Sequence, residues 1–413
     1  MFIDKKGGLN MEEGIKWIKN KKSRQEGKKA SVDFLSIEEL QKVKKFHESF
    51  DVYSKTPLAK LDNLAKKLGV SEIFVKDESY RFGLNAFKVL GGSYAIGKFI
   101  AKELGVDIKD ISFQKLRSEE TRKKIGQITF TTATDGNHGR GVAWAAQQLG
   151  QKAVVYMPKG SSKTRLNNIK ATGAEAFITD MNYDDAVRLS LKNANKYGWK
   201  IIQDTAWEGY EDVPVWIMQG YATMIIEAIE QMNGIGVERP THVFVQAGVG
   251  SLAGAVQGVL TSYYKENRPI TAVVEPHEAN CMYRSAVNGK ITNVGGDMPT
   301  IMAGLACGEP NPIGWGILDS YSDIFVSCPD NIAAEGMRVL GNPLKGDDRV
   351  ISGESGAVPA GFLYTILNDE KYKDIKEALK IDENSKILLI STEGDTDPDN
   401  YRKIVWDGCH PYK

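Results

Sequence analysis

The sequence is poor in cysteine and histidine. Its 413 residues include four cysteines and five histidines. No two cysteines have the C-x-x-C spacing of a zinc ribbon or a thioredoxin-type motif, and no two histidines have the spacing of a helical metal site. We therefore expect no metal. Cys281 and Cys307 could pair if the fold brings them together, but thiols are expected in a cytoplasmic protein.

Long apolar runs and an excess of one charge are also missing. No stretch approaches the roughly 18 apolar residues that favour a membrane-spanning helix, and residues 1–10 lack the apolar segment of a secretory signal. Both absences predict a cytoplasmic protein. Lys plus Arg and Asp plus Glu number 53 each, so net charge gives no reason to expect nucleic acid or an anionic membrane as a partner.

Short apolar runs alternate with helical patterns along most of the chain. This alternation predicts βαβ units, right-handed crossovers and largely parallel sheets, and therefore an α/β fold. The predicted strands are 73–78, 127–132, 152–157, 175–179, 200–203, 242–246, 270–274, 323–326 and 386–390. The predicted helices include 37–46, 61–68, 93–104, 139–149, 163–171, 183–197, 215–232 and 331–340. Ligands of such sheets bind where strands end, so the loops that follow strands are the candidate sites.

The first candidate is Lys88, in the segment NAFKVLGG of residues 85–92. It lies between a predicted strand and a predicted helix, which would hold it on rigid elements. Burial there favours the neutral amine, which is the form that attacks an aldehyde cofactor to form an imine. The alternative is an ordinary surface lysine.

The second candidate is the loop TTATDGNHGRG, residues 131–141, between a predicted strand and a predicted helix. Hydroxyls, an amide and glycines at a helix N-terminus can bind a carboxylate and a phenolate-like oxygen. Helix capping by Thr, Asp and Asn is the alternative.

The third candidate is the glycine-rich loop of residues 246–254, directly after the strand 242–246. Glycines and the helix N-terminus that follows suit a phosphate. Gly248, Gly250 and Ala253 also fit the dinucleotide fingerprint, with Glu275 as the ribose-binding acid. A nicotinamide-dependent dehydrogenase is therefore an alternative.

The fourth candidate is the segment STEGDTD of residues 391–397, after the apolar strand 386–390. A hydroxyl at this strand end can hydrogen-bond a pyridine nitrogen. A turn with an aspartate cap is the alternative.

Together, the four segments resemble the fold type II family of pyridoxal-phosphate enzymes in order and spacing, from about Thr56 to the end. The resemblance implies that pyridoxal 5'-phosphate forms a Schiff base with Lys88, that Phe87 lies by its ring and that Asn137 bonds its phenolic oxygen. It also implies that Ser391 or Thr392 faces the pyridine nitrogen. The phosphate would rest on Gly248, Val249, Gly250, Ser251 and Leu252, although the family usually has glycine where Val249 and Ser251 stand.

The same resemblance implies the architecture. We expect two doubly wound three-layer α/β domains with largely parallel sheets and the cofactor in the interdomain cleft. Residues 1–92 and 203–413 would form the large cofactor-binding domain, and residues 93–202 a small inserted domain. A homodimer is expected from the family alone.

Within the family, Asp135 stands where dehydratases typically have serine or alanine. Residues 132–141, 302–306 and 352–357 resemble the ammonia-lyases that act on a diamino acid. This implies elimination of ammonia from L- and D-2,3-diaminopropionate, giving pyruvate and two ammonia. The substrate carboxylate would bind to Thr134, Asp135, Gly136 and His138.

The chemistry of this elimination leads to the hypothesis of two bases. Lys88 would take the α-proton of the L isomer, and Asp135 would be the second base and would suit a β-ammonium. The alternative is a serine or threonine dehydratase in which Asp135 only caps a helix.

Overall fold

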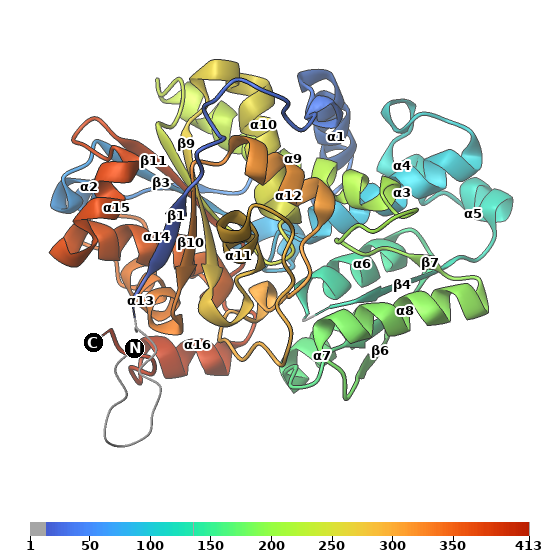
Figure 1. Ribbon diagram of the computed structural model, residues 1–413. Coiled ribbons are helices and arrows are strands. Elements are labelled where there is room, and N and C mark those ends of the chain that lie inside the picture. The colour runs from blue at the N-terminus through green and yellow to red at the C-terminus, as the bar shows by residue number, and fades with distance from the viewer. Residues whose placement is uncertain (1–13, 135, 413) are drawn as a thin grey trace.

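The computed structural model describes residues 14–134 and 136–412. Its strands form two sheets, one of seven strands and one of four (Figure 1). The α/β fold with largely parallel sheets is confirmed. No helix of the described ranges is both long enough and apolar enough to cross a bilayer.

The seven-stranded sheet has a parallel centre and antiparallel edges. The inner strands β10, β9, β8, β11 and β3 are parallel, while β1 and β2 are antiparallel edge strands. Its order is β1 (Lys16–Lys19), β10 (Ile324–Cys328), β9 (Ile270–Pro276), β8 (His242–Gln246), β11 (Lys386–Ser391), β3 (Glu72–Asp77) and β2 (Leu58–Lys60). The inner strands are runs of Val, Ile, Leu and Phe because helices cover both of their faces.

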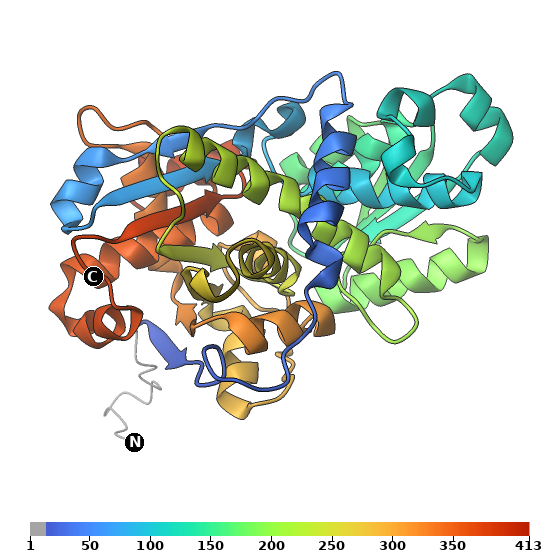
Figure 2. The same ribbon diagram turned by 90° about the horizontal axis from the view of Figure 1, so that it is seen from above.

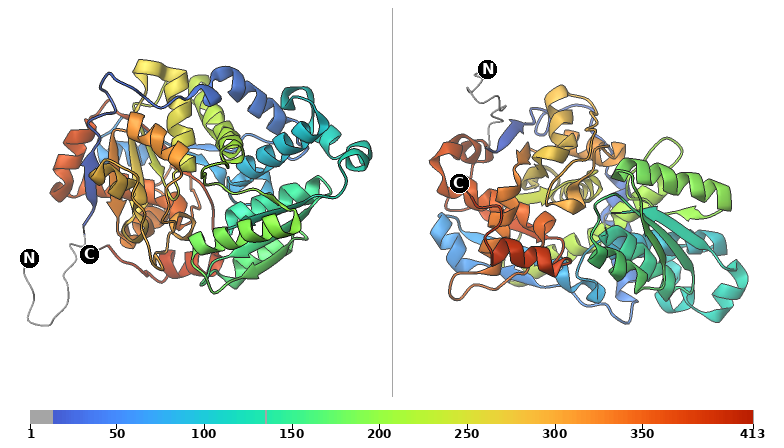
Figure 3. Two further views of the ribbon diagram at one scale, coloured as in Figure 1. Left: turned by 45° about the vertical axis from the view of Figure 1, so that its right-hand side comes forward. Right: turned by 90° about the horizontal axis from the view of Figure 1, so that it is seen from below.

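The four-stranded sheet is wholly parallel. Its order is β6 (Glu175–Ile178), β5 (Lys152–Met157), β4 (Thr129–Ala133) and β7 (Lys200–Ile201). Helices α6 and α8 cover its two faces (Figures 1 and 3). All four strands fall inside residues 93–202, as the predicted small domain requires, although the domain boundaries themselves remain a prediction.

Sixteen α-helices connect and cover the sheets in the described part of the chain. They are α1 (Ile37–Glu48), α2 (Asp62–Leu68), α3 (Val89–Leu104), α4 (Phe113–Leu116), α5 (Glu119–Ile125), α6 (Asn137–Gln148), α7 (Lys163–Lys170), α8 (Tyr183–Tyr197), α9 (Asp212–Gly234), α10 (Ser251–Tyr264), α11 (Cys281–Asn288), α12 (Pro312–Tyr321), α13 (Asp330–Gly341), α14 (Glu354–Asn368), α15 (Lys373–Leu379) and α16 (Pro398–Val405). In the view from above, α1 crosses α9 between the two sheets (Figure 2).

Glycines let α3 approach its neighbours closely. A Cβ on Gly141 of α6 would lie 2.8 Å from Val89 Cα, and a Cβ on Gly220 of α9 would lie 2.4 Å from Leu90 O. Both contacts involve the first turn of α3, directly after Lys88. The backbone that carries Lys88 is therefore clamped between two helices.

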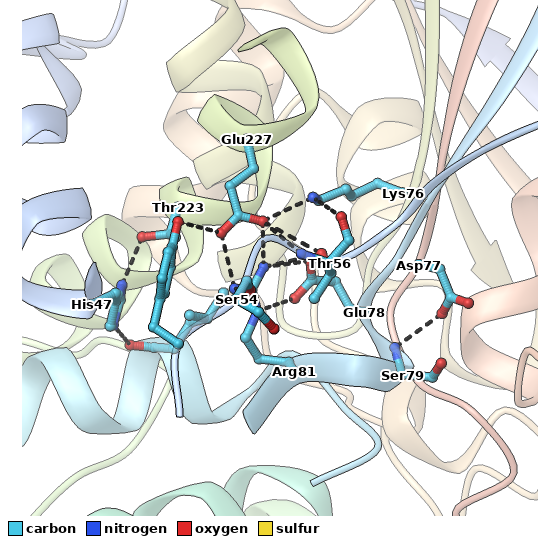
Figure 4. A network of polar contacts seen from close by, with 12 residues as sticks. His47, Ser54, Thr56, Lys76, Asp77, Glu78, Ser79, Arg81, Thr223 and Glu227 are labelled. Atoms are coloured by element: carbon cyan, nitrogen blue, oxygen red, sulfur yellow. Dashed lines mark hydrogen bonds and ion pairs between the residues drawn. The ribbon is translucent and has the colours of Figure 1, made fainter. Parts of the chain in front are cut away.

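Behind this turn lies a fully buried ion cluster (Figure 4). Glu227 Oε2 of α9 lies 2.8 Å from both Lys76 Nζ and Arg81 Nη2, and Arg81 Nε lies 2.8 Å from Glu78 Oε2. The side chains of these four residues are fully buried. The Thr56 hydroxyl donates to Glu78. The cluster joins β3, the 3-10 turn Glu78–Gly83 and α9. Glu78 is therefore a structural partner of the segment that runs from this turn to Lys88, called the lysine loop below, rather than part of a site.

Candidate active site

Lys88 is the N-cap residue of α3 and lines a cavity where the ends of β4, β7, β8 and β11 meet. Its Nζ lies 2.6 Å from Asp204 Oδ2. Lys88 has a side-chain exposure of 18%, and Asp204 of 3%. The sequence argument expected burial to favour the neutral amine, whereas a carboxylate at this distance favours the ammonium form.

Asp204 follows β7 and is a site residue that sequence reasoning missed. Burial raises the pKa of this carboxyl, but Lys88 and His138 outweigh burial and hold it well below its usual value. The Tyr183 hydroxyl also donates to Asp204 Oδ1, at 3.2 Å. The position directly after a predicted strand, 200–203, is the signal that could have identified it.

The lysine loop has an unusual backbone. Phe82 and Asn85 have φ values of 50° and 56°, in the left-handed region that residues other than glycine rarely adopt. Asn85 donates from Nδ2 to Asp395 Oδ1 at 3.2 Å, and its carbonyl accepts from Gly394 N at 3.1 Å. The segment after β11 therefore holds the lysine loop in this conformation.

The second candidate loop joins β4 to α6. Thr134 and His138 line the cavity, while Gly136 is not among its lining residues and Asp135 lies outside the described ranges. Thr134 Oγ1 accepts from Gly136 N (2.9 Å) and Gly139 N (3.0 Å), so it satisfies a backbone N–H in the first turn of α6, whose N-cap residue is Gly136.

His138 is a buried residue with two polar neighbours. Its Nε2 lies 2.8 Å from Ile202 O, and its Nδ1 lies 3.9 Å from Asp204 Oδ2. The His138 ring therefore lies beside the Asp204 carboxylate, which faces Lys88.

The third loop connects β8 to α10 and ends at Gly250, whose φ is 90°. A Cβ on Gly250 would lie 2.6 Å from Met282 Cε, so only glycine fits without a shift. Residues 248 to 252 all line the cavity opposite Lys88. A lysine amine, a glycine-rich loop and the N-terminus of a 14-residue helix in one cavity fit an aldehyde cofactor with a phosphate.

Glu275 does not fit the dinucleotide alternative. Its carboxylate is fully buried and accepts hydrogen bonds from Met282 N (2.9 Å) and Tyr283 N (2.7 Å) at the start of α11. It is not among the cavity-lining residues, so it cannot bond a ribose there.

The fourth segment places Thr392, rather than Ser391, on the cavity. Thr392 Oγ1 accepts from Gln246 Nε2 at 2.8 Å, whereas Ser391 Oγ donates to Ser352 Oγ at 2.9 Å behind it. The cavity also includes Phe87, Asn137 and residues without a predicted role, among them Tyr183, Tyr221, Leu305, Cys307, Ser355 and Glu393.

Comparison with known proteins agrees with this geometry. Residues 50–392 match the family model "Pyridoxal-phosphate dependent enzyme". The chain is 55% identical over 367 residues to diaminopropionate ammonia-lyase of Escherichia coli K12, covering 89% of this chain and 91% of that protein. The chain belongs to the pyridoxal-phosphate dependent enzyme family, with the diaminopropionate ammonia-lyases.

Solved structures of these ammonia-lyases have the same fold. The holo enzyme of Escherichia coli superposes with a TM-score of 0.90 at 51% identity, over 96% of this chain and 98% of that one. Its complex with an "aminoacrylate-PLP azomethine reaction intermediate" gives 0.88 at 50% identity, with the same coverage. A biosynthetic L-threonine dehydratase of Haemophilus influenzae is only 27% identical, over 58% of this chain and 39% of its own length.

Proposed function

We propose that this pyridoxal-phosphate enzyme eliminates ammonia from 2,3-diaminopropionate, giving pyruvate and two ammonia. The observation that carries the proposal is one cavity that holds the Lys88–Asp204 pair, the glycine-rich loop and the N-termini of α6 and α10. The similarity to the ammonia-lyases gives the substrate. The more distant dehydratase relative does not support the serine or threonine alternative.

Lys88 holds the cofactor in this proposal, and Gly248 to Leu252 hold its phosphate. When bound, pyridoxal phosphate supplies an imine and an electron-withdrawing ring that make the α-proton of an amino acid removable. Lys88 Nζ takes that proton from the L isomer. Asp204 Oδ2, at 2.6 Å, holds the resulting ammonium in place and so positions the base.

The remaining cofactor contacts come from three loops. Phe87 lies beside the ring, Asn137 donates to the phenolic oxygen, and Thr392 is the hydroxyl for the pyridine nitrogen because it lines the cavity and Ser391 does not. The substrate carboxylate binds at the start of α6, near Thr134, Gly136 and His138, where the helix N-terminus favours an anion.

The first test measures the covalent bond. The holoenzyme is expected to absorb at the wavelength of a pyridoxal imine, to lose that band on treatment with borohydride, and to form pyruvate from diaminopropionate. Lys88→Ala is expected to abolish both the band and pyruvate formation. A colourless wild-type protein that is indifferent to borohydride would contradict the proposal.

The second test concerns Asp135, which we propose as the base for the D isomer. Asp135→Asn should lower turnover of D-diaminopropionate by about 10²–10⁴-fold if the carboxylate moves a proton. If it only caps α6, the variant should lose about 1 kcal/mol of stability and keep its turnover. Assays with L- and D-diaminopropionate and with L-threonine compare these outcomes.

We also propose a cytoplasmic homodimer in which residues 93–202 form the small domain. The support is the location of the four-stranded sheet within these bounds and the expectation from the family. Light scattering on the purified holoenzyme measures the mass in solution. A monomer at micromolar concentration would contradict the dimer.

A further inference from the structure

Glu393 lies where three loops of the site meet. Its backbone forms an antiparallel bridge with Ala86, two residues before Lys88. On either side of it, Phe87 N donates to Thr392 O at 3.0 Å and Gly394 N donates to Asn85 O at 3.1 Å. The position of Glu393 is therefore set by the lysine loop itself.

The Glu393 side chain points to the second candidate loop, between β4 and α6. Its carboxylate accepts a hydrogen bond from Asn137 Nδ2 at the start of α6 and another from Thr396 Oγ1 at 3.5 Å. Glu393 is 2% exposed and lines the cavity. Gly353 packs against it so closely that a Cβ there would lie 2.9 Å from Glu393 Cγ. The carboxylate is held in one orientation, beside the loop expected to bind the substrate carboxylate.

Among the described residues that line the cavity, acidic side chains outnumber basic ones. One lysine, Lys88, and two carboxylates, Asp204 and Glu393, line it. Lys88 forms an ion pair with Asp204. Diaminopropionate with both amines protonated carries two ammonium groups and one carboxylate, whereas serine carries one of each. The excess of negative charge therefore suits the diamino acid.

We propose that Glu393 binds the ammonium on the substrate's β-carbon and so selects a diamino acid over a hydroxy amino acid. This inference rests on the function proposed above. A charge-assisted hydrogen bond to an ammonium is stronger than a hydrogen bond to a hydroxyl. Glu393 is thus a specificity-determining residue, distinct from the Lys88–Asp204 pair.

The same contact suits the leaving group. In the elimination, the α-proton goes to the base, the C–H electron pair forms the Cα–Cβ double bond, and the Cβ–N bond breaks with its pair on nitrogen. A β-ammonium then departs as neutral ammonia and needs no further proton. A carboxylate that keeps this nitrogen protonated therefore favours departure of ammonia.

The test compares two ligands that cannot react. α-Methyl-2,3-diaminopropionate and α-methylserine lack the α-proton and differ in the β-ammonium and the β-hydroxyl. Calorimetric titration of the holoenzyme is expected to show tighter binding of the diamino ligand. Glu393→Gln keeps an acceptor for Asn137 and should reduce that preference by about 10- to 100-fold, as expected for loss of a hydrogen bond to a charged group.

Two further variants are the controls. Asp395→Asn removes a carboxylate two residues away that bonds Asn85 and is not among the cavity-lining residues, so it should keep the preference. Glu393→Asp keeps the negative charge and should therefore keep part of the preference for the diamino ligand. This result would support the proposal even if Glu393→Gln does not fold. An unchanged preference in Glu393→Gln, equal weakening of both ligands, or loss of the preference in Asp395→Asn would overturn it.

Wild-type turnover separates this inference from the proposed function. If the wild type does not form pyruvate from diaminopropionate, the function itself fails. If it does so and Glu393→Gln still prefers the diamino ligand, only the assignment of Glu393 fails.

Discussion

Lys88 Nζ and Asp204 Oδ2 lie 2.6 Å apart although 116 positions separate them in the chain. We expect Asp204→Asn to lower kcat/KM for diaminopropionate by about 10²–10⁴-fold, because an amide does not stabilise the ammonium that Lys88 forms on taking a proton. Steady-state kinetics over a pH range measure the loss. Turnover and a pH profile equal to those of the wild type would contradict this role.

A second prediction concerns the buried ion cluster. Glu227→Gln should destabilise the protein by roughly 3–5 kcal/mol, because it leaves Lys76 and Arg81 buried with one carboxylate too few. Glu230→Gln, one turn along α9, is the control. Glu230 is 36% exposed where it pairs with Lys44 and Lys55, so its loss should cost about 0–1 kcal/mol. Urea unfolding of both variants measures the difference, and equal losses would contradict it.

A third prediction concerns pH. Burial raises the pKa of Glu275 to about 8, against the lowering effect of the Met282 and Tyr283 N–H groups. The folded protein therefore binds this proton more tightly than the unfolded chain, in which the pKa of the glutamate is near its ordinary value of 4.5. The stabilisation is full below pH 4.5, falls as pH rises, and is lost above about pH 8.

Glu275→Gln removes this titration. The variant's free energy of unfolding should fall less than that of the wild type between pH 5 and pH 8.5, and the difference should grow by roughly 1.4 kcal/mol per pH unit until about pH 8. Urea titrations at several pH values, with reductant constant, measure both slopes. Parallel slopes for the two proteins would show that Glu275 titrates normally.

A fourth prediction concerns the packing of α6 on α3. Gly141→Ala places a methyl group 2.8 Å from the Val89 backbone, so the helices must separate next to Lys88. We expect a loss of about 1–3 kcal/mol, as for other overpacked cores, together with reduced turnover. Gly234→Ala is the control, since a Cβ there meets nothing within 4 Å. Thermal unfolding and pyruvate assays test both variants. Wild-type stability and turnover in Gly141→Ala would show that the two helices can accommodate the methyl group.

Local patterns predicted much of the fold. The strands 152–157 and 242–246 and the helix 183–197 have the predicted bounds, because each is a single apolar or amphipathic run between turn residues. The edge strand β1 was missed. Its four residues, KWIK, pair with β10 some 300 positions away, and no local pattern reports such a partner.

The site was predicted in part for the same reason. Lys88, Asn137 and the loop 248–252 stand in recognisable motifs, and all of them line the cavity. Asp204 has no motif, since only the fold brings it to Lys88. Glu393 was part of a recognised segment, but its contact with Asn137 depends on how two sheets are placed. Such relations between distant segments are absent from any single stretch of sequence.

Strand β11 lies between β8 and β3 in the middle of the large sheet, although it is the last strand in chain order among the described residues. It carries the segment that pairs with the lysine loop. A nascent chain on the ribosome therefore cannot complete the sheet or the cofactor pocket until residues 386–393 have emerged. A chain truncated before residue 386 would lack the middle strand of the sheet and the wall of the cofactor pocket that Thr392 and Glu393 form.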